Sequence, residues 1–196
     1  PGDIGKFFLV LSLVASLVAT IAFFKANQSN IIGEKQSWLR IARFSFLLET
    51  ISVLSIFVIL YYIISNHLFE YKYAWQHSDR SLQIEYLLSC FWEGQEGSFM
   101  LWSFWHCVLG WVLIKTSKDW EAGVMTVVSF AQFCLATMII GMYFFGSKVG
   151  SNPFVLLRNE MDAPIFSRPE YLTLIKDGNG LNPLLQNYWM VIHPPI

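Results

Sequence analysis

The sequence predicts an all-α integral membrane protein with about four transmembrane helices and two long extracytoplasmic segments. Of its 196 residues, 55% are hydrophobic and 17% aromatic, while only 14% are charged. Soluble domains carry roughly 25% charged residues. The apolar residues also gather in blocks long enough to cross a bilayer, which takes about 20 residues. These observations together place the chain in a membrane.

Four apolar blocks are the predicted spans, at 7–24, 44–64, 98–114 and 122–145. The first follows Lys6, as the apolar core of a signal peptide would. It is longer than such a core, however, and no small-residue cleavage site follows it. We therefore interpret the first block as a retained helix.

Charges between the blocks orient the spans, because cytoplasmic loops carry an excess of Lys and Arg. Basic residues are concentrated in the connections 25–43 and 115–121, whereas acidic residues dominate 67–97. We therefore expect the N-terminus on the extracytoplasmic side, together with the two long segments 65–97 and 146–196.

Charge and cysteine content exclude several classes of protein. The net charge of −1 provides no basic field for nucleic acid. Cys90, Cys107 and Cys134 form no CxxC pair, so a thiol-exchange or zinc site is not expected. No CxxCH is present either, so the chain does not attach haem to itself. Because it begins at Pro1 and ends in an unfinished motif, we interpret it as an N-terminal fragment.

The stretch WEGQEG at 92–97 combines two glycines and two carboxylates at the start of the third span. Gly94 and Gly97 allow a tight turn or a close backbone approach, and Ser98 is a candidate cap for the helix. Trp92 fits an interfacial aromatic belt equally well. The combination with Glu93 and Glu96 would suit a flat amphipathic ligand at the membrane surface.

Two ionisable residues fall inside predicted spans, where such groups are functional candidates. Ser45, Glu49 and Ser52 share one helix face, so Glu49 should point into the bundle. It is a candidate for a proton path or a bond to a neighbouring helix. His106 lies in the middle of the third span, and a neutral, hydrogen-bonded bundle histidine is its alternative role.

The chain ends with a histidine followed by two prolines. A residue before proline is driven out of the helical region, and proline suits the first turn of a helix. We therefore expect His193 at or just before a helix that Pro194 and Pro195 would open. An imidazole held there could be an axial ligand of haem iron, although a simple helix-entry role explains the motif too.

Three motifs in order, WEGQEGSFMLW (92–102), SNPF (151–154) and GLNPLLQNYWMVIHPPI (180–196), resemble the CcmF-type cytochrome c haem lyase family. Tyr73 followed by His77 and Ser78 resembles a further motif of that family. Two departures are mild, with Glu93 where the family has glycine and Asn187 where it has aspartate. The resemblance covers most of the chain from Tyr73 onward and, loosely, the first two spans.

The resemblance implies a function in cytochrome c biogenesis at a bacterial inner membrane. Such proteins receive a b-type haem at the outer face and help attach it covalently to the thiols of an apocytochrome CxxCH. Expected partners are haem, a haem chaperone, apocytochrome c, other cytochrome c maturation membrane proteins and the lipid bilayer, with no nucleic acid. A tryptophan-rich segment and a second outer histidine of the family would follow residue 196, so we expect this part alone to be inactive.

Among the residues, the resemblance assigns His193 to the haem iron and Trp92 to the haem-binding wall, and it leaves catalytic residues unknown. The remaining motif residues are of open role: His77, Glu93, Gly94, Glu96, Gly97, Asn182, Pro183, Gln186, Pro194 and Pro195. Two alternatives stay open, an ion- or proton-conducting membrane subunit and a non-catalytic assembly scaffold. The first predicts charges aligned along several spans, and the second predicts no haem dependence on His193.

Overall fold

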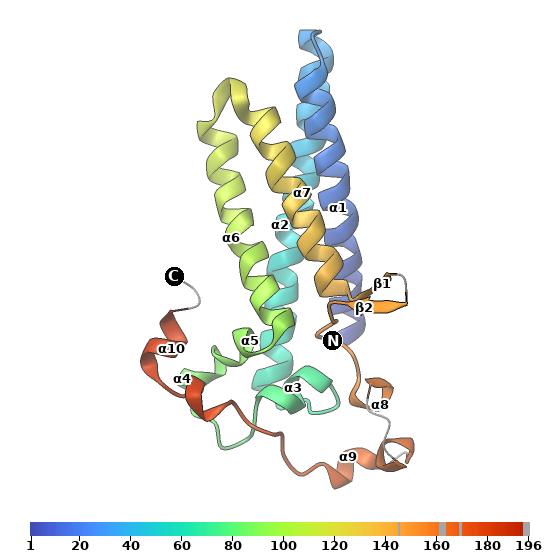
Figure 1. The fold of residues 1–196 in the computed structure, drawn as a ribbon, viewed down its shortest axis with the longest axis vertical. Coiled ribbons are helices and arrows are strands. Elements are labelled where there is room, and N and C mark those ends of the chain that lie inside the picture. The colour runs from blue at the N-terminus through green and yellow to red at the C-terminus, as the bar shows by residue number, and fades with distance from the viewer. Residues whose placement is uncertain (145, 161–163, 169, 194–196) are drawn as a thin grey trace.

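Four long helices form the body of the protein in the computed structural model, which describes residues 1–144, 146–160, 164–168 and 170–193 (Figure 1). Each is long and apolar enough to cross a membrane. Their bounds are Gly2–Gln28 for α1, Ile32–Ser65 for α2, Gln95–Thr116 for α6 and Glu121–Ile140 for α7. The predicted all-α membrane fold with about four spans is confirmed.

The four helices close into a bundle in which α1 contacts α2 and α7, and α6 contacts α7 and α2. One face of α1 is built from small buried residues, namely Ser12, Ala15, Ser16, Ala19, Ala22 and Ala26. Small side chains let helix backbones approach closely inside a membrane, where no hydrophobic effect drives helices together. Gly110 of α6 serves the same purpose, because a Cβ there would lie 2.3 Å from the Phe46 ring.

The helix ends differ from the predicted span ends in an instructive way. α1 and α2 extend past their apolar blocks, because hydropathy marks contact with lipid rather than helical backbone. The fourth predicted span reached residue 145, but α7 ends at Ile140. Gly141 adopts a left-handed φ of 73° there, a common way to end a helix. A short antiparallel hairpin follows, formed by β1 (Met142–Phe144) and β2 (Ser147–Val149).

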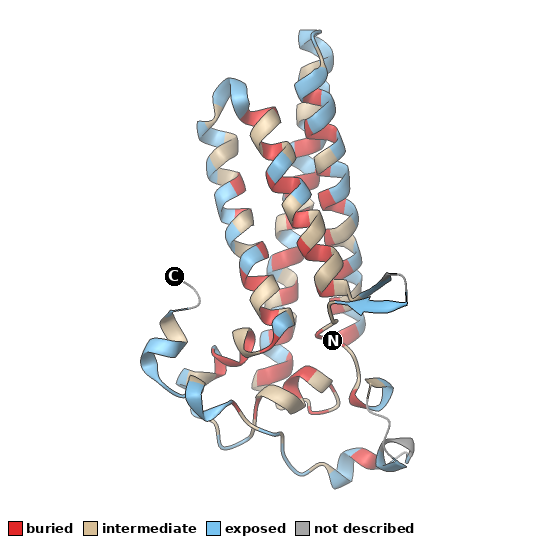
Figure 2. Ribbon diagram, viewed as in Figure 1, coloured by how far each residue is buried: buried red, intermediate tan, exposed pale blue. Residues whose placement is uncertain are grey.

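Residues 66–94, 141–144, 146–160, 164–168 and 170–193 lie at one end of the bundle (Figure 1). We call them the extramembrane layer. Its short elements are α3 (Lys72–His77), α4 (Ile84–Leu87), α5 (Cys90–Glu93), α8 (Leu157–Glu160), η2 (Pro164–Ser167), α9 (Tyr171–Leu174), η3 (Pro183–Leu185) and α10 (Tyr188–Ile192). Figure 2 shows buried residues concentrated in α3 and α5, whereas α10 is largely exposed.

The SNPF motif packs the extramembrane layer against α1 of the bundle. The Asn152 side chain accepts a hydrogen bond from the Phe154 N–H at 2.8 Å, which forms the predicted turn. Phe154 is thereby fully buried against Gly5 of α1, where a Cβ would lie 2.6 Å from its ring. Close by, the Gly2 N–H donates to the Tyr71 hydroxyl at 3.0 Å. The start of α1 is therefore held by both halves of the extramembrane layer.

Candidate functional site

Tyr73 anchors the turn between α5 and α6. Its side chain is buried, and its hydroxyl lies 3.0 Å from the Cys90 carbonyl oxygen and 2.8 Å from that of Phe91. Burial raises the pKa of Tyr73 well above its ordinary value, so the hydroxyl stays protonated and donates. It satisfies carbonyl groups that the break between the two helices would otherwise leave without a donor.

Neighbouring atoms leave little space for a side chain at Gly94 or Gly97 in this turn. A Cβ at Gly97 would lie 1.2 Å from the Phe91 carbonyl oxygen, a distance that no side chain can adopt. A Cβ at Gly94 would lie 2.5 Å from the Tyr73 ring and 3.0 Å from His77 Nε2. The predicted tight turn at 92–97 is therefore present, and Tyr73 and His77 are the side chains packed into it.

His77 and Glu93 form an electrostatic contact beside the turn. His77 Nδ1 lies 3.0 Å from Glu93 Oε2, and the two side chains are 18% and 14% exposed. The atoms are close, but their angles fall outside those of a hydrogen bond. The His77 ring also packs against Tyr73, with ring centroids 4.6 Å apart. Tyr73, His77 and Glu93 therefore form a chain of contacts beside the turn.

Glu93 then joins the first motif to the last. Its Oε1 accepts a hydrogen bond from the Asn182 N–H at 2.9 Å, across 89 positions of sequence. The Asn182 side chain accepts from the Leu184 N–H at 3.0 Å, which starts η3 with Pro183 in its first turn. Gln186 Nε2 donates to the Leu181 carbonyl oxygen at 3.0 Å. The LNPLLQ stretch is therefore a compact turn attached to the WEGQEG turn.

Backbone hydrogen bonds extend the same attachment. The Asn179 N–H donates to the Trp75 carbonyl oxygen at 2.8 Å, and the Gly180 N–H donates to that of Ser78 at 3.3 Å. Gly180 has a left-handed φ of 82°, and a Cβ at Gly178 would lie 2.0 Å from the Ser78 carbonyl oxygen. The DGNG turn before the last motif is therefore fitted to the end of α3.

Two expectations about the first motif need correction or remain open. Ser98 does not cap α6, which begins at Gln95; the Ser98 hydroxyl instead donates to the Trp92 carbonyl oxygen at 3.1 Å. Glu96 lies within the first turn of α6 and is half-buried. Trp92 packs against the core, and its buried indole N–H has no partner among the described residues. Its assignment to a haem-binding wall remains a prediction.

His193 follows the last residue of a short helix, α10 (Tyr188–Ile192). Its N–H donates to the Trp189 carbonyl oxygen at 3.0 Å, and its backbone is helical, with φ −63° and ψ −45°. The helical backbone of His193 differs from the extended conformation expected of a residue before proline. Asn187 caps the start of α10 by accepting a hydrogen bond from the Trp189 N–H at 3.0 Å, and the expected helix start after His193 lies outside the described residues. The predicted roles of Pro194 and Pro195 lie outside the described residues.

The surroundings of His193 fit half of a haem site. The imidazole is exposed, and Tyr188 and Trp189 beside it are 66% and 68% exposed, with rings 5.4 Å apart. An accessible imidazole is one of the axial ligands that haem iron takes in proteins. Within the described ranges, no cluster of three or more His, Cys, Asp or Glu side chains could hold a metal ion. The assignment of His193 to haem iron remains a prediction.

The two ionisable residues within the spans have different environments. Glu49 is buried in the bundle, with Ser12 Oγ donating to its Oε1 at 3.3 Å, and Ser45 and Ser52 are buried on the same helix face, as predicted. His106 instead lies on the outward face of α6. Its Nδ1 lies 2.9 Å from the Trp102 carbonyl oxygen, and it lines a groove of about 430 Å³ with Trp102, Trp105 and Leu109. The bundle-interior placement of His106 was wrong, although its hydrogen bond is present.

The cysteines of the chain are free thiols among the described residues. Burial raises the pKa of the Cys90 thiol to about 12. A thiol with that pKa carries almost no thiolate at neutral pH and is a poor nucleophile.

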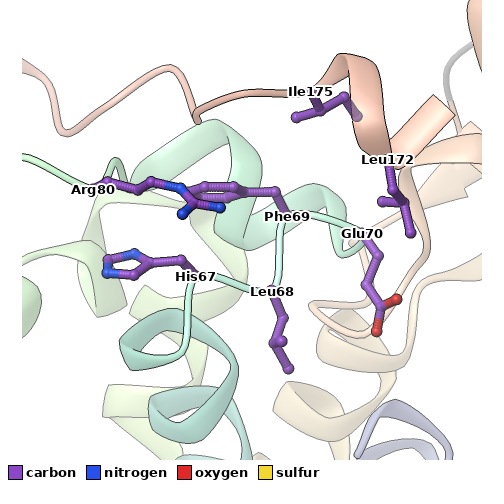
Figure 3. Close-up of a pocket in the computed structure, with 7 residues that line it drawn as sticks. All are labelled: His67, Leu68, Phe69, Glu70, Arg80, Leu172 and Ile175. Atoms are coloured by element: carbon purple, nitrogen blue, oxygen red, sulfur yellow. The ribbon is translucent and has the colours of Figure 1, made fainter.

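One hollow in the extramembrane layer was not foreseen from the sequence. It has a volume of about 200 Å³ and lies between the end of α2 and α9 (Figure 3). It is lined by His67, Leu68, Phe69, Glu70, Arg80, Leu172 and Ile175. These residues come from three separate stretches and form no motif. The only local signal was the isolated Arg80 in an acidic segment.

Comparison with known proteins identifies similar sequences across the whole chain. It is 29% identical to the cytochrome c-type biogenesis protein CcmF of Haemophilus influenzae, over 99% of the chain and 27% of that protein. It is 27% identical to NrfE of the same organism, with the same coverage. CycK of Bradyrhizobium diazoefficiens is 25% identical over 98% of the chain and 26% of that protein. Both are also named cytochrome c-type biogenesis proteins.

The chain spans about a quarter of the length of these curated relatives. No protein-family model matches it, and no solved structure matches it significantly. The similarity nevertheless covers all four long helices and the segments between them. These findings support the assignment of the chain to the CcmF-type family of cytochrome c-type biogenesis proteins.

Proposed function

We propose that this chain is part of a cytochrome c haem lyase and that His193 is an axial ligand of the haem on its way to apocytochrome c. One observation carries the proposal: the hydrogen bond from Asn182 to Glu93 joins the first and last motifs into a single surface. His193 is exposed and follows the LNPLLQ stretch by way of α10. The names of the relatives support cytochrome c biogenesis as the general function.

The reaction assigned to the complete protein adds the two thiols of an apocytochrome CxxCH across the two vinyl groups of haem. Each sulfur bonds to a vinyl carbon and the thiol hydrogen goes to the other carbon, so no oxidant is consumed. The thiols must be reduced and the porphyrin must be held in one orientation, because the cofactor itself supplies the reactive groups. In this proposal the chain orients haem through His193. The cluster of Tyr73, His77 and Glu93 positions the C-terminal segment that contains His193.

The excess of basic residues in the connections 25–43 and 115–121 supports an orientation with the extramembrane layer outside the cytoplasm. Apocytochrome thiols and haem would then meet on the outer face of a bacterial inner membrane. A haem chaperone and other maturation proteins of that membrane are the proposed partners. The names of the relatives favour this account over an ion-conducting subunit.

The proposal is tested by His193→Ala in the full-length protein, expressed in cells that lack their own copy. Covalent haem in c-type cytochromes is stained after gel electrophoresis, with protein levels measured by immunoblot. We expect loss of covalent haem with normal protein levels, whereas Lys176→Ala, an exposed change in the same segment, leaves staining unchanged. Normal maturation with His193→Ala would contradict the proposal and favour the scaffold alternative.

A further inference from the structure

We infer that the hollow between the end of α2 and α9 binds an anionic group, a carboxylate or a phosphate, attached to an apolar body. His193 does not line this hollow. The inference rests on the proposed function only for the case in which the bound ligand is haem. The inference stands on the unpaired cationic and polar groups on one side of the hollow and on the apolar wall on the other.

Arg80 supplies the charge. Its guanidinium lies over the Phe69 ring, with Cζ 5.7 Å from the ring centroid, and no carboxylate of the described chain lies within ion-pair distance of it. Stacking on an aromatic face holds the planar guanidinium in place. A fixed guanidinium offers parallel N–H groups that match a carboxylate or phosphate in geometry and charge.

His67 supplies a second polar group on the same side. Its Nδ1 is buried and has no hydrogen-bond partner among the described residues, and its ring centroid lies 5.8 Å from that of Phe69. The backbone at His67 has a φ of 51°, in the left-handed region that histidine adopts more often than most residues other than glycine. His67 lines the hollow, so its unpaired imidazole is available to a ligand bound there.

The acidic residues nearby form no ion pair with Arg80 among the described residues. Figure 3 shows the Glu70 carboxylate directed away from Arg80. Asp177 Oδ1 accepts the backbone N–H groups of Arg80 and Gly178 at 2.9 and 2.8 Å. Asp79 Oδ1 accepts from the N–H and hydroxyl of Ser81, both at 2.7 Å. These two carboxylates are therefore engaged by local donors.

The opposite wall indicates an amphiphile rather than a free ion. Leu172 and Ile175 lie across Phe69 from Arg80 and His67 (Figure 3), and Leu68 also lines the hollow. His67 follows the end of α2 at Ser65 by two residues, so the hollow lies where a spanning helix leaves the bilayer. A phospholipid with an anionic headgroup and a haem with its propionates both combine an anion with an apolar body.

The test uses the full-length protein in nanodiscs and two probes. In the first arm, native mass spectrometry measures retention of phosphatidylglycerol relative to phosphatidylcholine. In the second, hemin is titrated against hemin dimethyl ester, which lacks the propionate charges. We expect Arg80→Ala to weaken binding of one charged probe by about tenfold or more, since hydrogen bonds to charged groups are the strong ones. His67→Asn, which tolerates a left-handed backbone, should weaken the same probe by a smaller factor.

Arg158→Ala is the matched control, an exposed arginine in α8 of the same layer. An effect of Arg80→Ala on phosphatidylglycerol alone assigns the site to lipid, and an effect on hemin but not on its ester assigns it to propionates. Equal binding by the wild type and Arg80→Ala in both arms would overturn the inference, as would an equal effect of Arg158→Ala. Neither arm requires cytochrome maturation, so failure here is separable from failure of the His193 test.

Discussion

At the scale of single residues, the WEGQEG turn depends on Gly97, where a Cβ would collide with backbone. Gly97 meets the Phe91 carbonyl oxygen, and Tyr73 donates to that same oxygen at 2.8 Å. The glycine and the tyrosine therefore act together. Gly97 allows the backbone of α6 to approach Phe91, and the Tyr73 hydroxyl donates a hydrogen bond to the Phe91 carbonyl oxygen, which would otherwise lack a donor. Conformational freedom alone does not explain Gly97, since its helical backbone suits any residue.

Gly97→Ala should destabilise the protein, because the new Cβ must displace the backbone at Phe91. We expect a melting temperature lower by about 5 °C or more, from the cost of overpacking. Gly33→Ala is the control, since a Cβ at Gly33 meets nothing within 4 Å and alanine favours a helix. Equal melting temperatures for Gly97→Ala and the wild type, measured by intrinsic fluorescence, would contradict this account of the turn.

At the scale of elements, one carboxylate holds the final segment on the α5 turn. Glu93→Ala removes the acceptor of the Asn182 N–H, so we expect faster deuterium uptake in peptides that cover 178–186. Glu93→Gln keeps an acceptor oxygen and loses the charge facing His77. It should therefore protect Asn182 nearly as well as the wild type does. The same fast uptake in both variants would show that the charge, not the hydrogen bond, holds the segment.

A second link at this scale depends on pH. Glu160 of α8 contacts Lys148 of the hairpin and lies 3.2 Å from Lys72 Nζ of α3. The hydrogen bond from Lys148 and then that from Lys72 lower the pKa of Glu160 below its ordinary 4.5. A carboxylate with a lowered folded-state pKa contributes stability at neutral pH, and this stability is lost as the pH falls through that pKa.

Glu160→Gln should therefore flatten the acid side of the stability profile. We expect the melting temperature of the wild type to fall more steeply below about pH 4.5 than that of the variant. Glu85→Gln, an exposed change in α4, serves as the control. The measurement is a melting-temperature series from about pH 7 to pH 3. Parallel curves for the wild type and Glu160→Gln would exclude this link between the hairpin, α8 and α3.

At the scale of the whole molecule, the sequence was sufficient for the bundle and insufficient for the layer beside it. Apolar blocks predict four spans because lipid contact constrains every residue along a helix. The end of α7 was missed by five residues, since Gly141 ends the helix within an apolar stretch. α10 was also missed, although Asn187 carries an ordinary capping signal.

Contacts between distant segments were beyond prediction from one sequence. The Glu93–Asn182 hydrogen bond and the hollow beside Arg80 depend on how 66–94 and 141–193 fold together. Sequence periodicity predicts neither contact, because the hydrogen bond takes one residue from each segment and the hollow combines 67–70 with Arg80, Leu172 and Ile175. The motifs could be predicted to lie on one side of the membrane, but their joining could not.

The central claim, that His193 ligates haem, is tested most directly by chemical rescue. His193→Gly in the full-length protein removes the imidazole and leaves room for a free one, and Lys176→Gly is the control in the same segment. We measure covalent haem in c-type cytochromes, and the optical spectrum of haem on the purified protein, with and without added imidazole. The account predicts loss of both signals in His193→Gly and their recovery with imidazole. Maturation that persists without the imidazole, or a loss that imidazole does not restore, would contradict it.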